Sequence, residues 1–519
     1  MFYKLNQLIK ALTKRERAVF LTSTAVFTIA VAVFGVYLFT AKTVEAPAHG
    51  GVWKEGIVGQ PVFINPVISN TDADQDISRL IFAPLSDLTE SIKSDETGRE
   101  WTVRLKDNLK WQDGEKITTD DILFTFDTIT NTQTNSYLAS SFEGASIQRV
   151  SELEVKFTLP SSYVFFNTTL KNLRPIPKHI FEDIPPANFY LSSYVKEPIG
   201  SGPYVYKSVS KEKDGFIDEY VLESNRNYFG NRPYIQKFVF RFYKDEAEAV
   251  TAYNRGEING FATSNPMVVS NIKTARVIHT ISAPRYYAVF FNPALNPYFK
   301  DKKTRQTLSA AISREEIVKS VFNGMAEPAY GPLPSVETPI PDKSNLDLVD
   351  RQSFTLTVPD IDLLVRMAEI IKSDWEKLGV SVTVKPVKTS EVQEIIKNRS
   401  YEAVLFGNIL NEPQDLFSFW HSSKRFYPGL NLAFFNNLEV DRLLDSIRTE
   451  PDENRRLEEL SQASRTISDE SAAAFVVFPE YIYITTPNLK GFETDSGIIL
   501  SDRLNDVTSW YVSSVRKFK

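Results

Sequence analysis

The 519-residue sequence contains no cysteine, and this absence removes several kinds of site at once. Disulfides, thiolate metal ligands, cysteine nucleophiles and lipid-modified cysteine anchors are all excluded. Histidine is scarce, with only His49, His179, His279 and His421, and no two of them have the H-x-x-x-H spacing of a metal-binding pair. The sequence therefore predicts neither a metal site nor a cofactor.

The motifs of common nucleotide-binding and catalytic sites are also absent. Neither a P-loop nor a G-x-S-x-G sequence occurs. Gly200-Ser201-Gly202 is followed by Pro203, which would abort the helix that a dinucleotide-binding fingerprint requires. The chain has 65 Asp and Glu residues, yet no local spacing nominates an acid–base pair. We therefore predict no catalytic residue and no enzyme activity.

Charge is distributed unevenly along the chain. The first 17 residues hold five basic residues against Glu16, a net charge of +4, which leaves −10 for the rest of a chain whose total is −6. An acidic body argues against nucleic acid as a partner. The basic head at 1–17 calls for a different explanation, which the next segment supplies.

The 24-residue segment 18–41 contains no charged residue. As a helix it would span about 36 Å, enough to cross a hydrocarbon core of about 30 Å. The positive-inside rule places 1–17 in the cytoplasm and everything after Lys42 outside. We therefore predict a single-pass cell-membrane protein whose body lies on the extracytoplasmic side.

A cleaved secretory signal is the alternative for this segment. Ala46-Pro47-Ala48 resembles an A-x-A cleavage site. The apolar core of a signal peptide is usually about 7–15 residues, well short of the run at 18–41. The length favours an uncleaved anchor, and the body is exported in either case.

Beyond the apolar segment, residues 42–51 resemble a short polar tether, and strand and helix patterns then alternate without a fixed repeat. Alternating apolar residues predict a strand over 101–105, and a capped helix is predicted over 120–130. Ser313 and Glu316 have the spacing of a capping box for a helix over 314–322.

The second half of the chain has a clearer α/β pattern. Leu364, Ala368, Ile371 and Trp375 recur at steps of four and three, which predicts an amphipathic helix. Strand patterns follow at 380–387 and 402–407, with a further helix pattern between them. An α-β-α-β run of this kind indicates an α/β fold with helices packed on parallel strands.

Six segments resemble, in the right order, the extracellular solute-binding proteins of family 5, the peptide-binding components of ABC importers. They include KWQDGEKITTDDILFTF, GSGPYVY, an NYFGNRPY…GEING block and WEKLGVSVTV…YEAVLFG, and they fall within residues 50–66, 101–126, 200–206, 227–260, 291–331 and 372–407. The resemblance covers about residues 50 to 495. Each block alone is weak evidence for the resemblance, whereas the occurrence of all six in the family's order is strong evidence.

The resemblance implies a periplasmic-binding-protein-like fold with two lobes, a hinge and an extra subdomain in the first lobe. The expected division is a cytoplasmic head (1–17), a transmembrane anchor (18–41), a tether (42–51), a first lobe (52–280) with an inserted subdomain (about 77–190), a second lobe (281–485) and a segment returning to the first lobe (486–519).

The resemblance also implies a function. A protein of this family would capture peptides between its lobes and deliver them to an ABC permease in the membrane. A second interpretation keeps the fold but changes the solute to an oligosaccharide or a metal chelate. A third is a membrane-anchored hydrolase, for which the sequence nominates no catalytic constellation.

A cleft that accepts varied peptides needs backbone hydrogen bonds, aromatic walls and a few fixed polar groups. The residues that we expect to line it are Asn411, Glu412, Trp420, His421, Asn431, Tyr287, Asn292 and Asn65. Packing in the core is the alternative for Trp420, and a structural hydrogen bond is the alternative for His421. Asn65 and Asn292 precede proline and would then shape turns, while Tyr287 would pack the hinge.

One feature departs from the family pattern. Peptide-binding relatives carry an acidic residue, after a Y-x-A-x-x-x-G strand, that holds the ligand's free amino group. Here Ile409 or Leu410 falls near that position. Either Glu412 or Asp415 takes over this role, or the ligand has no free amine at that end, or both acids lie on a solvated loop and cap a helix at 416–421.

Overall fold

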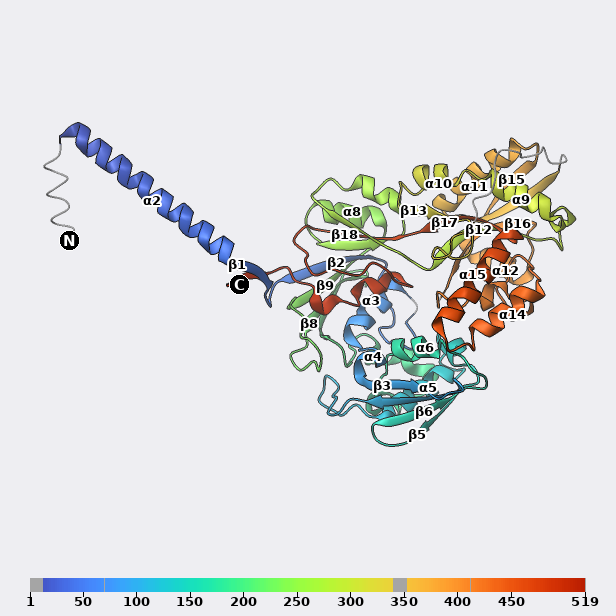
Figure 1. The fold of residues 1–519 in the computed structure, drawn as a ribbon. Coiled ribbons are helices and arrows are strands. Elements are labelled where there is room, and N and C mark those ends of the chain that lie inside the picture. The colour runs from blue at the N-terminus through green and yellow to red at the C-terminus, as the bar shows by residue number, and fades with distance from the viewer. Residues whose placement is uncertain (1–12, 70, 339–351, 411, 519) are drawn as a thin grey trace.

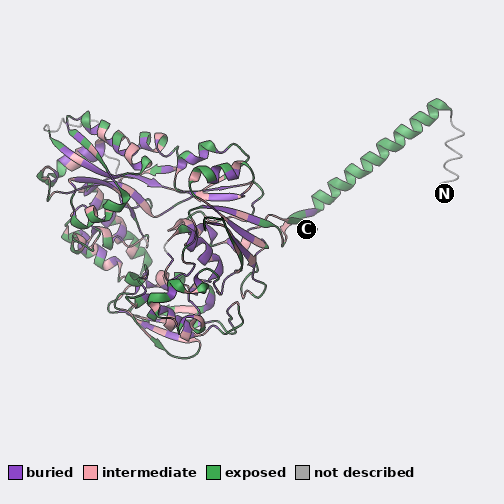
Figure 2. Ribbon diagram, turned by 180° about the vertical axis from the view of Figure 1, so that it is seen from behind, coloured by how far each residue is buried: buried purple, intermediate pink, exposed green. Residues whose placement is uncertain are grey.

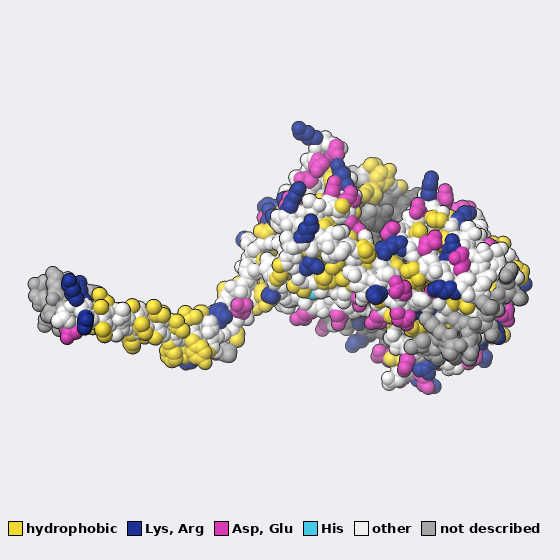
Figure 3. Space-filling view, turned by 90° about the horizontal axis from the view of Figure 1, so that it is seen from above, with side chains coloured by type: hydrophobic (Ala, Val, Ile, Leu, Met, Phe, Trp, Pro, Cys, Tyr) yellow, Lys and Arg dark blue, Asp and Glu magenta, His cyan; other side chains and the backbone are white. Residues whose placement is uncertain are grey.

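The computed structural model describes residues 13–69, 71–338, 352–410 and 412–518. A lone helix, α2 (Lys14–Lys42), projects from a two-lobed body (Figure 1). Within these ranges it is the one helix that is long and apolar enough to cross a membrane. None of its residues is buried (Figure 2), and apolar side chains cover it between charged ends (Figure 3). The helix expected over 18–41 is confirmed.

The segment after this helix differs from the expected tether. Strand β1 (Thr43–Pro47) pairs antiparallel with β19 (Ser514–Phe518), near the other end of the chain. Residues 43–47 of the predicted polar tether over 42–51 thus form a paired strand. Its pairing partner lies more than 460 residues away in the sequence, so no local pattern could indicate it.

The first lobe is built on a seven-stranded mixed sheet. Its strands, in spatial order, are β11 (Val277–Ile281), β18 (Tyr481–Thr485), β10 (Gly260–Thr263), β2 (Val52–Val58), β9 (Lys237–Tyr243), β8 (Ile217–Ser224) and β7 (Tyr204–Lys211). Strands β10, β2 and β9 run parallel at its centre. The helices α3 (Asp72–Ile81) and α8 (Glu246–Asn254) both contact β2.

A subdomain with its own antiparallel sheet lies within the first lobe (Figure 1). Its strands are β3 (Thr89–Ser94), β4 (Glu100–Leu105), β6 (Glu154–Thr158) and β5 (Ser146–Arg149), and its helices are α4 (Leu85–Leu88), α5 (Thr119–Thr130), α6 (Phe166–Asn172) and α7 (Lys178–Phe181). Thr118 and Asp121 form the capping box of α5. The strand over 101–105 and the helix over 120–130 are thus confirmed.

The second lobe has a six-stranded sheet with helices around it. The strand order is β13 (Ala326–Pro328), β17 (Ala473–Pro479), β12 (Arg285–Phe291), β16 (Ala403–Ile409), β14 (Ser353–Pro359) and β15 (Ser381–Val387). The helices are α9 (Lys302–Ala311), α10 (Arg314–Ser320), α11 (Asp362–Glu376), α12 (Thr389–Asn398), α13 (Phe417–Trp420), α14 (Leu438–Ile447) and α15 (Glu453–Asp469). Strand β14 runs parallel to β15 and β16, as the α-β-α-β pattern predicts.

The capping box expected at Ser313 is wrong in its detail. Helix α10 begins at Arg314 as predicted, but the Ser313 side chain makes no capping hydrogen bond. The backbone N–H of Ser313 instead donates to Asp374 Oδ2 at 2.8 Å, across the packed helices α10 and α11. The buried Arg314 guanidinium holds the same turn by donating to the Ala329, Phe475 and Ser309 carbonyls.

The chain crosses between the two large sheets twice. The first crossing joins β11 to β12 through residues 282–284, and the second joins β17 to β18 through Glu480. The second lobe was expected to extend to residue 485, so that boundary is wrong by one strand. Both β17 and β18 are fully buried apolar strands, and no periodicity marks where the chain changes sheets.

The C-terminal segment is fastened to the first lobe by a buried ionic network. The Arg503 guanidinium lies 2.9 Å from Glu55 Oε1 and also contacts Asp76, and all three side chains are almost fully buried. Trp53 and Tyr483 donate to the same Glu55 carboxylate, each at 2.9 Å. Every buried charge of this network therefore has an opposite charge and additional hydrogen bonds.

Candidate functional site

Two strands of the second lobe meet at its edge nearest the hinge. The first residues of β12 pair with the last residues of β16, so that Arg285 lies opposite Ile409 and Tyr287 opposite Gly407. A Cβ atom at Gly407 would come within 2.7 Å of Tyr287 Cε1. The absence of a side chain at 407 therefore lets the half-buried Tyr287 ring lie against the neighbouring strand.

Arg285 and Tyr481 bring the two crossing strands together. The Arg285 guanidinium lies 4.2 Å from the centroid of the Tyr481 ring, a cation–π contact, and donates to the Glu480 carbonyl at 3.4 Å. Within the described part of the chain, Arg285 has no acidic partner among the ion pairs, and its buried Nε–H has no acceptor. This cation is free to meet an anionic group at the hinge.

Acidic side chains lie on the first-lobe side of the hinge. Burial raises the pKa of Tyr481, and the charges of Asp72 and Asp502 raise it further, while Arg285 lowers it. Burial also raises the pKa of Asp72, with Asp76 adding to the effect. Asp502 and Asp76 are paired with Arg79 and Arg503. Arg285 and Asp72 have no ion pair with another described residue, so these two side chains suit a ligand that carries both charges.

A hydrogen-bonded trio occupies the opposite face of the same sheet. The Asn408 amide and the Trp420 indole donate to the Tyr286 hydroxyl at 2.8 and 3.2 Å. Trp420 has no exposed surface and packs near Phe475. The structure thus gives Trp420 a core position, with no surface that a solute could contact in this conformation.

The three predicted asparagines that the structure describes, Asn65, Asn292 and Asn431, are also buried, and their side chains form hydrogen bonds with the backbone. Asn431 donates to the Phe435 carbonyl at 2.9 Å and accepts from its N–H at 3.0 Å. Asn292 donates to the Arg399 and Tyr401 carbonyls at 3.0 and 2.9 Å. Both side chains hold loop backbone in place. For Asn292 this agrees with the alternative given from the sequence, in which the residue shapes a turn.

Asn65 is also buried and holds backbone, but its side-chain nitrogen lacks a hydrogen-bond partner among the described residues. Its side-chain oxygen accepts from the Val67 N–H at 2.9 Å, which closes a turn after Pro66. Asn65 therefore shapes the loop before α3.

His421 is engaged by its own neighbours. Its ring stacks on Phe417 at 4.3 Å, and Nδ1 lies 2.7 Å from the Ser423 hydroxyl. Nε2 faces the Asp441 and Asp445 carboxylates at 3.8 and 3.7 Å. These contacts match the structural alternative proposed for this residue from the sequence.

A family model matches residues 83–427, well over half of the chain, and its description is bacterial extracellular solute-binding proteins, family 5 Middle. This chain belongs to that family. The resemblance predicted from the sequence motifs is confirmed, together with the two-lobed α/β fold.

Relatives of known structure extend the match over both lobes of this family 5 protein. Oligopeptide-binding protein AppA of Bacillus subtilis is 27% identical over 503 residues, covering 87% of this chain and 90% of AppA. The solved structure of AppA with a nonapeptide has a TM-score of 0.69 and 26% identity, covering 90% of this chain and all of that one. The substrate-binding protein CtaP of an ABC transporter in Listeria monocytogenes has a TM-score of 0.77 and 27% identity, with the same coverage.

A third structure shares the fold alone. NikZ from Campylobacter jejuni, in complex with Ni(L-His), has a TM-score of 0.68 and 21% identity and covers 89% of this chain and 99% of its own. Within the described residues of our family 5 protein, no group of three or more His, Asp or Glu side chains is arranged to hold a metal ion.

The loop that departs from the family pattern joins the second lobe to the subdomain. Asp415 accepts from the Phe417 N–H at 3.0 Å and from the Tyr163 hydroxyl at 3.1 Å, and it lies 3.3 Å from Arg448 Nε. The Val164 N–H donates to the Arg448 carbonyl at 2.9 Å. Asp415 is therefore committed to capping α13 and to contacts between the lobes, rather than solvated.

The other acid of this loop remains available. Glu412 is half-buried, and burial raises its pKa, which a hydrogen bond with Thr168 partly offsets. Asn411 lies outside the described residues. Of the seven residues expected to bind ligand that the structure describes, Glu412 and Tyr287 are the two whose surroundings leave a ligand contact open.

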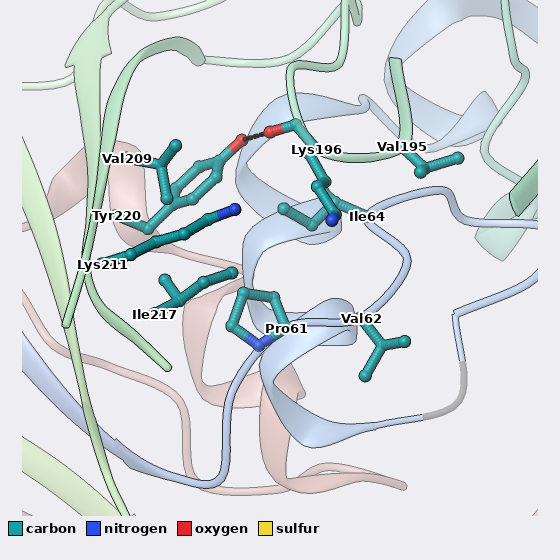
Figure 4. A pocket seen from close by; sticks show the side chains of 9 residues that line it. All are labelled: Pro61, Val62, Ile64, Val195, Lys196, Val209, Lys211, Ile217 and Tyr220. Atoms are coloured by element: carbon teal, nitrogen blue, oxygen red, sulfur yellow. Dashed lines mark hydrogen bonds between the residues drawn. The ribbon is translucent and has the colours of Figure 1, made fainter. Parts of the chain in front are cut away.

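A small cavity in the first lobe lies apart from the hinge (Figure 4). It has a volume of about 10 Å³, room for about one water molecule, and a mostly apolar lining that includes Ile64, Val209 and Tyr220. The Tyr220 hydroxyl donates to the Lys196 carbonyl at 2.7 Å beside it. Ligand pockets usually enclose about 300–1,000 Å³, so this cavity is small for a peptide.

Sequence reasoning missed Arg285, Asp72 and Tyr163 as residues at the lobe junctions. Arg285 stands directly before the two tyrosines where the chain was expected to enter the second lobe, and that position was the available signal. Nothing local marks Asp72 or Tyr163, because each gains its role from residues more than 200 positions away.

Proposed function

We propose that this chain is a membrane-anchored extracytoplasmic binding protein that encloses peptides between its lobes and delivers them to an ABC importer. The relationship to oligopeptide-binding AppA, over 87% of this chain, carries the proposal. The role is binding rather than catalysis, since the family to which the chain belongs consists of solute-binding proteins.

The hinge residues supply the ligand contacts in this proposal. Arg285 would pair with a ligand carboxylate, because its guanidinium has no acidic partner among the described residues and is preorganised on Tyr481. The Tyr287 ring would form a flat wall, and Glu412 would receive a ligand amine. Asp415 is excluded from the amine role because Tyr163 and Arg448 already contact its Oδ2 and the Phe417 N–H donates to its Oδ1.

The anchor is the second part of the proposal. Cleavage after Ala48 would remove β1 and leave β19 without its pairing partner. An exported protein that loses β1 would expose a strand edge with unpaired backbone groups, which natural sheets avoid. The β1–β19 pairing therefore favours retention of the helix at 14–42.

Calorimetry with short peptides tests the binding function. An unblocked peptide should bind the wild type, an amidated peptide should bind less well, and Arg285→Gln should remove that difference. Glu412→Gln should weaken the unblocked peptide by about 2–5 kcal/mol while leaving its acetylated analogue unaffected. Failure of every peptide to bind, together with a non-peptide solute in the protein as purified, would overturn the peptide assignment.

A metal chelate is the second candidate solute, because NikZ shares the fold and was solved with Ni(L-His). The hinge carboxylates could meet the amino acid part of such a chelate. Mass spectrometry of the solute that co-purifies with the closed protein separates the two candidates, since a chelate adds the mass of a metal ion.

A further inference from the structure

The C-terminal strand lies where the long helix joins the body (Figure 1). Helix α2 ends at Lys42 and β1 begins at Thr43, so no linker separates them. Strand β19 pairs with β1 over five residues, and the Phe518 ring lies 6.3 Å from the Phe39 ring of the helix. Arg516 also donates to the Thr43 hydroxyl at 3.1 Å. We name this two-stranded unit, residues 43–47 with 514–518, the juxtamembrane ribbon.

The juxtamembrane ribbon exposes apolar side chains that no other described segment covers. Val44, Val515 and Phe518 are exposed by 45%, 46% and 75%. Val44 lies opposite Lys517 and Val515 opposite Ala46, so these four side chains share one face of the ribbon. An apolar face of this kind is out of place in bulk water.

Basic side chains accompany the apolar ones. The helix end and the ribbon contain Lys42, Arg516 and Lys517 against the single acid Glu45, which lies opposite Arg516. Apolar side chains next to lysine and arginine are the combination that binds the boundary between lipid headgroups and acyl chains. The protein body as a whole is acidic, so this basic patch is a local feature.

The position of the ribbon agrees with that chemistry. If the apolar helix crosses the bilayer, Lys42 lies at the edge of the hydrocarbon core, and the headgroup layer on each side is about 5–8 Å thick. A strand rises about 3.3 Å per residue, so the first two or three pairs of the ribbon lie inside this layer. These pairs contain Phe518, Lys517 and Val44.

We propose that the juxtamembrane ribbon binds the phospholipid headgroup layer and thereby fixes the distance and tilt of the two-lobed body above the membrane. The inference rests on the anchor in the proposed function, because the helix brings the ribbon to the bilayer. It follows that β19, a five-residue strand far in sequence from the membrane-spanning helix, also contacts the membrane.

Single-cysteine labelling tests this directly, because the natural chain has no cysteine. Nitroxide labels are placed on the full-length protein at Phe518 and Val44, in the first two pairs of the ribbon, at Val26 in the helix and at Val150 in the subdomain, by substitution to Cys. Each protein is reconstituted into phosphatidylcholine vesicles with and without phosphatidylglycerol. Collision rates with oxygen and with a water-soluble nickel chelate then report the depth of each label.

Labels at Phe518 and Val44 should show nickel accessibility several-fold below that at Val150, with the larger reduction in the anionic vesicles. Arg516→Gln with Lys517→Gln should raise the nickel accessibility at Val44 towards that at Val150. Agreement between the two ribbon positions guards against a local effect of one substitution.

Three results would overturn the inference in distinguishable ways. Ribbon labels as accessible as Val150, with Val26 in lipid, would refute the ribbon contact and leave the anchor intact. A water-accessible label at Val26 would refute the anchor and the ribbon contact together. Protection of the Val44 label from both collision reagents that disappears at low protein density would indicate a second protein chain in place of lipid.

Discussion

Closure of the two lobes should depend on the hydrogen bond between Tyr163 and Asp415. The phenol donates to the carboxylate at 3.1 Å across the junction between the subdomain and the second lobe. Burial raises the pKa of Tyr163 and the Asp415 charge raises it further, so the donor keeps its proton. Tyr163→Phe removes this donor with little change of shape.

The size of the effect follows from the charge of the acceptor. A hydrogen bond to a charged group contributes about 1.5–3 kcal/mol, and the Asp415 side chain is only 12% exposed. Arg448 remains beside the carboxylate, so we expect the lower part of that range. If the bond exists only in the closed state, peptide affinity falls about tenfold, because 1.4 kcal/mol corresponds to a factor of ten.

Tyr228→Phe is a matched control inside one lobe. The Tyr228 hydroxyl donates to the Asp87 carboxylate at 3.4 Å, and both residues belong to the first lobe. Calorimetry measures peptide affinity, and small-angle scattering measures the compaction that hinge closure on ligand should produce. Equal losses of affinity in the two variants, or an unchanged radius of gyration with saturated wild type, would refute the reasoning.

Further predictions concern stability, the hinge wall and pH. Arg503→Met should lower the free energy of unfolding by about 3–5 kcal/mol, because two buried carboxylates lose their counter-charge. The control is Arg104→Met, which removes an ion pair with Glu90 in which both side chains are more than half exposed, and it should cost about 0–1 kcal/mol. A denaturant titration measures both values. Gly407→Ala should displace the Tyr287 ring and weaken peptide binding while the protein still folds, as circular dichroism would check. Burial raises the pKa of Glu412 above 4.5, so its contribution to the free energy of unfolding is complete below pH 4.5 and is lost as pH rises through the folded-state pKa. Glu412→Gln should flatten this pH dependence of the free energy of unfolding. An identical pH profile in the variant would contradict the raised pKa of Glu412.

Local patterns were sufficient for the elements that depend on neighbours in sequence. The uncharged run at 18–41 becomes a helix in the structure because its propensity and length are local properties. The amphipathic stripe through Leu364 and Trp375 packs in α11, and the order of helices and strands predicts the parallel pairing of β14 with β15 and β16. Family motifs in a fixed order were enough to indicate two lobes.

Contacts between distant residues were decided only by the tertiary structure. Trp420 and Asn431 have residue types suited to a binding site, yet their burial depends on the packing of the second-lobe core, which no local pattern specifies. The same applies to the pairing of Asp415 with Tyr163 and of β1 with β19. Sequence periodicity reports which side of an element is apolar, whereas the partner of that side is selected by the fold as a whole.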